Sequence, residues 1–169
     1  MKKMAKMAKI AKTTRKATRH KENTVQQQPG TYALLLSSAT NAVIRVGRFG
    51  DLHLQPGFYV YVGSALGPGG VRARIAHHNR PAERPHWHID YLRPKMTLEG
   101  AWLRYGRKSL ECQWARRFAA MLGASMPMPG FGSSDCDCES HLFLLGKRPA
   151  RSLRPTATRL GSTVTYCAF

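Results

Sequence analysis

Acidic residues are scarce in this sequence. Of its 169 residues only 9 are Asp or Glu, against 27 Lys or Arg, so the formal net charge is +18 at pH 7. A surplus of this size points to a polyanionic partner, most simply a nucleic acid. The surplus is concentrated at the two ends: residues 1–28 hold nine Lys or Arg and one acid, and residues 147–169 hold five and none. The stretch 29–146 is only mildly basic.

Long hydrophobic runs are also lacking. Runs such as Ala33 to Leu36 are far below the roughly 20 apolar residues that span a bilayer, and the N-terminus lacks the apolar core of a secretory signal. The four cysteines are therefore expected to be reduced thiols in a cytosol-like compartment. We expect a cytoplasmic protein, with association with the nucleoid as one option. An organellar transit peptide is the alternative for the acid-poor N-terminus.

Both basic ends are predicted to be tails. Lys3, Lys6 and Lys9 recur every third residue, which would suit a short basic helix on a polyanion. Such a short and highly charged helix is unstable alone in water, so we expect residues 1–28 to be disordered. Residues 147–169, which contain two prolines, are predicted to be a second tail. Contacts between these tails and phosphates would add affinity that falls steeply with salt.

The middle of the chain, residues 29–146, has the patterns of one folded domain. Turn signals separate short runs of β-branched, aromatic and other apolar residues, which predict strands. A helix is expected over 71–79, and a second from the cap Ser109 to about Leu122, with Gly123 as its stop. This mixture predicts a compact α/β sandwich. The predicted strands cover 31–36, 43–46, 51–54, 58–62, 98–105 and 140–145.

Two predicted strand ends carry matching motifs, Gly30-Thr31-Tyr32 and Tyr61-Val62-Gly63. Arg74 and His78 follow on one predicted helix, and Glu111 lies at the start of the next. This ordered set resembles the GIY-YIG nuclease superfamily. The stretches GTYALLL, PGFYVYVGSALG, PHWHIDYL, ECQWA and GFGSSDCDCESHLF resemble most closely the Uri-like stand-alone endonucleases. The resemblance covers about residues 29–146 and neither tail.

The resemblance implies a fold, an activity and a site. The fold would be an α+β sandwich, with a small central, mostly antiparallel sheet flanked by helices. The activity would be that of a divalent-metal-dependent endonuclease, which hydrolyses phosphodiester bonds in DNA or, less favoured, in RNA. One Mg²⁺ or Mn²⁺ would be bound by Glu111. Tyr32, Tyr61, Arg74 and His78 would be the catalytic residues.

These residue types suit phosphodiester hydrolysis. Arg74 is permanently charged and can grip phosphate oxygens as a fork, and Glu111 offers the hard oxygen that Mg²⁺ prefers. Tyrosine is a poor base at its usual pKa near 10 and would need a nearby cation or a metal-bound water to act. His78 could relay a proton or hold a phosphate. Each residue also has a structural alternative. The tyrosines could serve packing, Arg74 could be a solvated helix residue, and Glu111 could favour the helix dipole.

The chain departs from the family pattern in two respects. One is a glycine loop before the predicted helix of Arg74 that is longer than in the minimal members. Many members carry an Asn well after the glutamate, whereas the last Asn here is Asn79. Ser134 and Asp135 are the candidates to replace it. The missing Asn keeps open an alternative function, a non-catalytic nucleic-acid-binding module on a GIY-YIG-like scaffold.

A histidine-rich segment, His86-Trp87-His88-Ile89-Asp90, is a candidate secondary site for a metal or a phosphate. In a strand, His86, His88 and Asp90 would share one face, and Asp135 could join them. In a helix that begins after Pro85, His86 would pair with Asp90 instead. The structural alternative is a polar network that anchors a loop, with Trp87 and Ile89 packed inward.

A cysteine cluster is the second candidate metal site. Cys136, Cys138 and His141 lie close in sequence, and Cys112 lies upstream. Three thiols and one imidazole can satisfy tetrahedral zinc, although this spacing is not that of a standard zinc finger. The structural alternative to a zinc site is reduced cysteines in a loop, with Cys112 in the core. If zinc is bound, a zinc-stabilised structural protein bound to RNA becomes a further alternative for the function of the whole chain.

Overall fold

Six strands form the central sheet of the protein, which is known from a computed structural model that describes residues 25–151, 153 and 163–169. The strand order is β6-β7-β4-β1-β5-β8, and every neighbouring pair is antiparallel. A separate hairpin consists of β2 (Ala42–Arg45) and β3 (Asp51–Leu54). The expected α+β fold with an antiparallel central sheet is confirmed. The sheet strands are β1 (Gly30–Ser38), β4 (Gly57–Ala65), β5 (Thr97–Tyr105), β6 (Ala124–Ser125), β7 (Leu142–Leu145) and β8 (Thr165–Ala168).

Alternate side chains of β1 enter two different cores. Tyr32 and Leu34 belong to the core on one face of the sheet, whereas Ala33 and Leu35 belong to the core on the other. Successive residues of a strand point to opposite faces. Because both faces are covered, the strand is apolar along almost its whole length rather than alternating.

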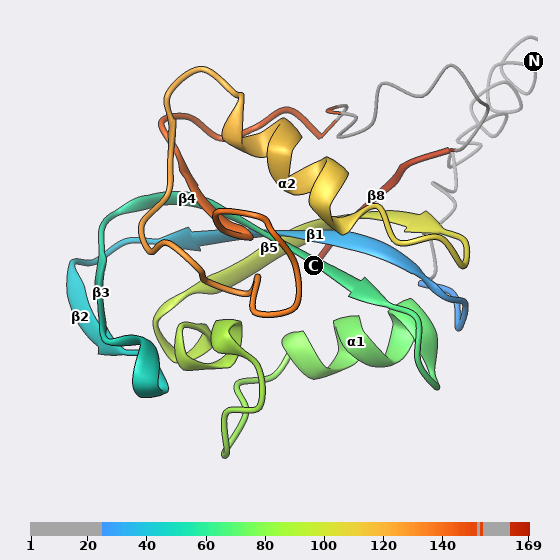
Figure 1. Cartoon of the computed structure of the whole chain (residues 1–169), viewed down its shortest axis with the longest axis horizontal. Coiled ribbons are helices and arrows are strands. Elements are labelled where there is room, and N and C mark those ends of the chain that lie inside the picture. Colours follow the sequence, from blue (N-terminus) through green and yellow to red (C-terminus); the bar gives the residue numbers. More distant parts are fainter. Residues whose placement is uncertain (1–24, 152, 154–162) are drawn as a thin grey trace, which may run out of the picture.

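Two helices cover the two faces (Figure 1). Helix α2 (Glu111–Ala119) packs Trp114 and Phe118 onto one face. Helix α1 (Gly70–His78) packs Val71 and Ile75 onto the other. On the side of α1 the chain also forms the short 3-10 segments η1 (Gly47–Phe49), η2 (His88–Tyr91) and η3 (Arg93–Lys95).

The first predicted helix is confirmed to within a residue, but two other predictions need correction. The second helix ends at Ala119 rather than near Leu122, and the stop Gly123, with φ +77, lies a few residues beyond it. The strand predicted over 58–62 continues to Ala65 because it pairs with β1 along its full length. Gly63, Ser64 and Ala65, which follow the predicted end, therefore belong to the strand.

Part of the predicted C-terminal tail is a strand, so the domain boundary expected at residue 146 is wrong. β8 pairs with the edge of β5, Cys167 is buried, and the Tyr166 ring contacts that of Trp102 with centroids 5.2 Å apart. The charge and prolines of the segment obscured the short apolar pattern at its end. Residues 154–162 lie outside the described part of the chain.

The boundary of the predicted N-terminal tail also moves, since residues 25–28 pack on the domain. Val25 contacts the core on the α1 side. The carbonyl oxygens of Gln26 and Gln28 accept hydrogen bonds from the N–H groups of Arg72 and Val71. These are N–H groups of the first helical turn, which need partners outside their helix. Residues 1–24, on which the prediction of a disordered tail rests, lie outside the described part.

No helix in the described part of the chain is long and apolar enough to cross a bilayer.

The role of β8 can be tested with two aromatic residues from the same segment. We expect Tyr166→Ala to lower the free energy of unfolding by about 2 kcal/mol, because it removes buried area and the contact with Trp102. Phe169→Ala is the matched control: that side chain is 48% exposed, so its loss should cost under about 0.5 kcal/mol. Urea denaturation measures both. Equal, small effects would contradict the pairing of β8 with the sheet.

Candidate active-site pocket

A polar pocket of about 370 Å³ lies between the sheet, α1, the start of α2 and the loop that precedes β7. A volume of this size is within the range of ligand-binding pockets. Several stretches of chain, far apart in sequence, contribute to it. Its lining consists of Tyr32, Tyr61, Gly63, Ser64, Arg74, His86, Trp87, His88, Glu111, Gly132, Ser134 and Asp135.

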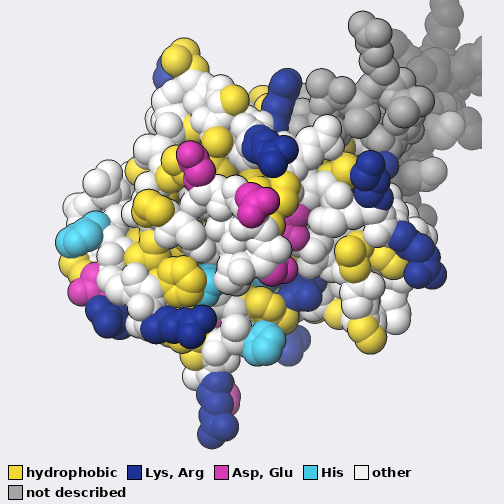
Figure 2. All heavy atoms as spheres, viewed as in Figure 1, with side chains coloured by type: hydrophobic (Ala, Val, Ile, Leu, Met, Phe, Trp, Pro, Cys, Tyr) yellow, Lys and Arg dark blue, Asp and Glu magenta, His cyan; other side chains and the backbone are white. Residues whose placement is uncertain are grey.

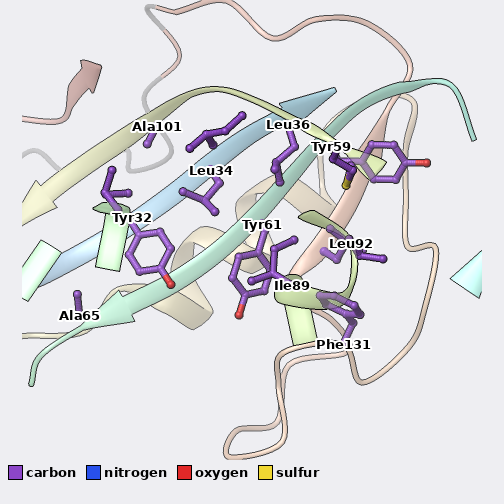
Figure 3. Packing of buried hydrophobic residues seen from close by; sticks show 14 of the residues in the cluster. Tyr32, Leu34, Leu36, Tyr59, Tyr61, Ala65, Ile89, Leu92, Ala101 and Phe131 are labelled. Carbon is purple, nitrogen blue, oxygen red and sulfur yellow. The ribbon is translucent and has the colours of Figure 1, made fainter. Parts of the chain in front are cut away.

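Strand register brings the two motif tyrosines together. Tyr32 lies opposite Gly63, and Tyr61 lies opposite Leu34, so the tyrosines are near neighbours on one face of adjacent strands. Their hydroxyl groups point to the same side of the sheet (Figure 3). A methyl group on Gly63 would collide with the Tyr32 ring. The glycine of the second motif therefore makes room for the tyrosine of the first.

His78 lies beneath the pocket and contacts Tyr32. It is fully buried, and its Nε2 is 3.0 Å from the Tyr32 hydroxyl oxygen. Burial lowers the pKa of His78 to about 3, against the opposing effect of Asp90. Burial also raises the pKa of Tyr32 well above 10, with a smaller contribution from Tyr61. Both side chains are therefore neutral near pH 7, with the hydroxyl group of Tyr32 placed to donate to the imidazole.

Asp90 continues this polar chain away from the pocket. Its carboxylate accepts hydrogen bonds from the backbone N–H groups of His86 and Trp87, and it lies 3.0 Å from Nε2 of His77. Burial opposes ionisation of Asp90, but these hydrogen bonds outweigh burial and lower its pKa. One of its oxygens lies 3.8 Å from Nδ1 of His78. A carboxylate here favours the tautomer with the proton on Nδ1, which leaves Nε2 free to accept from Tyr32.

The secondary cluster expected in the histidine-rich segment does not form as predicted. His86, His88 and Asp135 line the pocket, but Asp90 is buried behind it. A 3-10 turn over His88–Tyr91 replaces both the strand and the helix that were considered. The Asp90 carboxylate accepts hydrogen bonds from backbone N–H groups and contacts His77. Asp90 is therefore part of a polar network that anchors the loop, as in the structural alternative.

Arg74 enters the pocket across an aromatic ring. Its guanidinium carbon lies 3.9 Å from the centroid of the Trp87 ring, a cation–π contact that fixes the plane of the fork. Arg72, two residues earlier on the same helix, is exposed and hydrogen-bonds to Gln27. The structure therefore brings Arg74 rather than Arg72 to the pocket.

Glu111 reaches the pocket from the first turn of α2. The N–H of the preceding Leu110 donates to Oγ1 of Thr31, 2.9 Å away, which ties the start of the helix to the first motif. Glu111 Oε1 lies 3.1 Å from Nδ1 of His141. That distance is short enough for an ion pair, although the geometry is not that of a well-directed hydrogen bond.

The predicted cysteine cluster is brought together in space. The ligand atoms of Cys112, Cys136, Cys138 and His141 all lie within 4.8 Å of one another, as a group able to hold a metal ion. Burial raises the pKa of both Cys136 and Cys138, and the neighbouring thiols add to the effect for Cys138. A second group of this kind in the described chain consists of His77, His78 and Asp90.

Three features of the site were not expected from the sequence. Trp87 was assigned to packing, but it also supports Arg74. His141 was considered only with the cysteines, but it contacts Glu111. Arg93 had no assigned role; it is buried, and its Nε donates to the carbonyl oxygen of His78 at 2.7 Å. Each depends on a contact between distant segments, and no local pattern signals it.

Fold and site together define a small antiparallel α+β domain with a polar pocket of tyrosine, histidine, arginine and carboxylate side chains. Residues 31–162, most of the chain, match the family described as a domain of unknown function, DUF123, so the chain belongs to that family. No curated protein and no solved structure matches the chain.

The fit of Tyr32 against Gly63 can be tested by adding one methyl group. We expect Gly63→Ala to lower the free energy of unfolding by about 1–3 kcal/mol, because the Tyr32 ring must move out of its packed position. Gly67→Ala, in the same glycine-rich stretch, is the control, since open space surrounds that position. Urea denaturation measures both variants. Equal costs would show that Gly63 leaves no special room for Tyr32.

The buried neutral His78 predicts a pH dependence of stability. Its pKa is about 3 in the folded protein and near 6.5 when unfolded, so the unfolded state binds more protons as the pH falls below 6.5. Between pH 7 and pH 5 this should cost the wild type about 2 kcal/mol. In His78→Gln that loss should be absent, whereas Asp90, with its lowered pKa, acts only at lower pH. Urea denaturation at both pH values is the measurement; an unchanged pH slope in the variant would contradict the assignment.

Proposed function

We propose that this protein is a divalent-metal-dependent endonuclease that hydrolyses phosphodiester bonds, with DNA as the favoured substrate. One observation supports the proposal above all. Tyr32, Tyr61, Arg74 and Glu111 come from four different elements and line a single pocket. They are the positions at which the sequence resembles the GIY-YIG nucleases. The preference for DNA rests on that resemblance.

The charge of the molecule suits a polyanionic substrate. The chain carries a formal net charge of +18. Many Lys and Arg side chains lie around the rim of the face in Figure 2, whereas several acidic side chains lie nearer its middle. A basic rim would attract a phosphate backbone, and acidic groups further inside suit a cation.

Arg74 is proposed to neutralise the scissile phosphate. Its stacking on Trp87 leaves the edge of the guanidinium for two parallel hydrogen bonds to phosphate oxygens. Such a group is most effective when it is held in place before the charge develops, because it then costs no reorganisation during the reaction.

Tyr32 and His78 are proposed to orient the attacking water. When the Tyr32 hydroxyl donates to Nε2 of His78, the lone pairs of its oxygen face the pocket and can accept a hydrogen bond from water. His78 acts here as a positioning residue, since burial disfavours its protonated form. Tyr61 is neutral too, because burial and the nearby Glu111 raise its pKa. It is therefore suited to donate a hydrogen bond to a phosphate or leaving-group oxygen.

The oxygen-rich side of the pocket fits Mg²⁺ or Mn²⁺. Glu111, Asp135 and Ser134 offer carboxylate and hydroxyl oxygens, the ligands that these hard cations prefer. A cation there would supply Lewis-acid stabilisation of the phosphate. Ser134 and Asp135, which both line the pocket, are also the residues proposed to replace the missing Asn. Zinc is assigned instead to Cys112, Cys136, Cys138 and His141, because thiolates suit the softer ion.

The proposal predicts metal-dependent cleavage that depends on two side chains. We expect the wild type, with Mg²⁺ or Mn²⁺, to cleave at least one member of a panel of end-labelled DNA and RNA structures. Glu111→Ala and Arg74→Ala should each lower the single-turnover rate by about 100-fold or more while binding is retained, because each removes stabilisation of the transition state.

Two matched controls accompany these variants. Arg72→Ala removes an arginine two residues from Arg74 that hydrogen-bonds to Gln27. Glu139→Ala removes an exposed acid of the loop before β7 that does not line the pocket. Both variants should stay within a few-fold of the wild type. Binding without cleavage on every substrate would contradict the enzyme and favour the nucleic-acid-binding module. Cleavage that survives both Glu111→Ala and Arg74→Ala would contradict the assigned site.

A further inference from the structure

Four side chains with metal-binding chemistry converge beside the pocket, on the far side of Glu111. Cys112 lies on α2, Cys136 and Cys138 lie in the loop before β7, and His141 directly precedes that strand. Their ligand atoms lie within 4.8 Å of one another. These residues are separated by up to 29 positions in sequence, so it is the fold that gathers them.

The spacing of the ligand atoms fits a zinc ion. Zinc binds sulfur at about 2.3 Å and imidazole nitrogen at about 2.0–2.1 Å in a tetrahedron, so a sulfur and a nitrogen ligand should lie about 3.5 Å apart. Cys136 Sγ and His141 Nε2 are 3.4 Å apart. For two sulfur ligands the expected separation is about 3.8 Å, which the limit of 4.8 Å also accommodates.

The loop that carries these ligands is held on the protein by its backbone. The N–H of His141 donates to the carbonyl oxygen of Phe131, and its own carbonyl oxygen accepts from Val62 of β4, at 2.8 and 2.9 Å. The N–H of Gly132 donates to Nδ1 of His88 at 2.9 Å. The backbone of His141 and the start of the loop are therefore held in place before any ion binds.

The two nitrogens of His141 face different partners. Nε2 faces the cysteines, whereas Nδ1 faces Glu111 Oε1 at 3.1 Å. Histidines that bind zinc through one nitrogen commonly donate the N–H of the other to a carboxylate, which fixes the ring and strengthens the ligand. His141 and Glu111 have the separation that this arrangement requires, and a small rotation of either side chain would complete the hydrogen bond that Nδ1 lacks in the structure.

We infer that Cys112, Cys136, Cys138 and His141 bind one structural zinc ion, and that Glu111 supports this site by accepting a hydrogen bond from Nδ1 of His141. On binding, the three thiols release their protons to solvent, and His141 binds the ion through the lone pair of Nε2. All four positions are filled by protein, so the ion is structural. The carboxylate of Glu111 is then shared between the zinc site and the pocket. This last consequence rests on the proposed function, whereas the zinc site does not.

Metal analysis of the full-length protein tests the zinc site. We expect about one zinc per chain after exhaustive dialysis, and replacement by Co²⁺ should give thiolate charge-transfer and tetrahedral absorption bands. Cys138→Ser and Cys112→Ser should lose the ion, whereas Cys167→Ala, which alters the cysteine of β8, should retain it. Absence of retained zinc in the wild type, or zinc retained in both serine variants, would overturn the inference. So would a disulfide within the cluster of the purified protein.

The role of Glu111 is tested by zinc affinity, measured by competition with a chromophoric chelator. Glu111→Gln should keep the stoichiometry but weaken binding by about 10- to 100-fold, the usual effect of losing such a partner. Glu139→Gln removes one negative charge from the loop before β7 but leaves the contact between His141 and Glu111 intact. The zinc affinity of this variant should therefore match that of the wild type. Equal affinities in all three proteins would overturn the part assigned to Glu111.

These measurements need no nucleic acid, so they separate the two proposals. A zinc-loaded protein that cleaves nothing would retain the zinc site and lose the nuclease. Metal-dependent cleavage by a protein that holds no zinc would retain the nuclease and overturn the zinc site.

Discussion

The full-length pairing of β1 with β4 is the constraint on which the rest of the structure depends. Because side chains alternate across a strand, a shift by one residue would move Tyr32 to the face covered by α2, away from His78. The register that places Tyr32 opposite Gly63 also places Tyr61 two residues from it on the same face. Thr31, on the opposite face, then receives the N–H that begins α2. One register thus sets the position of three pocket residues, including Glu111.

A buried polar chain beneath the pocket complements this constraint. Polar groups removed from water destabilise a fold unless partners replace the lost hydrogen bonds. Here the Tyr32 hydroxyl group hydrogen-bonds to Nε2 of His78, and Asp90 lies 3.8 Å from Nδ1 of the same ring. Main-chain groups provide further partners: backbone N–H groups donate to Asp90, and the His78 carbonyl oxygen accepts from Arg93. Burial keeps His78 neutral, and its Nε2 directs the Tyr32 hydroxyl group. Function and stability therefore place the same demand on these residues.

Local sequence patterns predicted much of the fold and part of the site. The long strands, the β2–β3 hairpin and α1 follow from runs of apolar residues between turn signals. The ordered motifs led to residues that share one pocket, although nothing local specifies that Glu111 should meet them. The errors arose where tertiary pairing decides. β8 is too short and too close to basic residues to be recognised alone. From the sequence, the Asp90 carboxylate is a plausible metal ligand. Only the tight turn of residues 86–90 reveals that it accepts hydrogen bonds from backbone N–H groups instead.

Two cations with different ligand preferences would lie on either side of Glu111, a structural zinc ion at the cysteines and a hard cation in the pocket. Three thiolates and a divalent zinc ion carry a net charge of −1, so the zinc site would add no positive charge to the pocket. It would hold the start of α2 and the loop before β7 together, and through His141 it would limit the freedom of the Glu111 carboxylate. Neutralisation of a phosphate would then fall to Arg74 and a hard cation on the oxygen-rich side. A carboxylate that is oriented from behind by an imidazole can bind such a cation with less loss of side-chain entropy, which is the physical advantage of placing the two sites side by side.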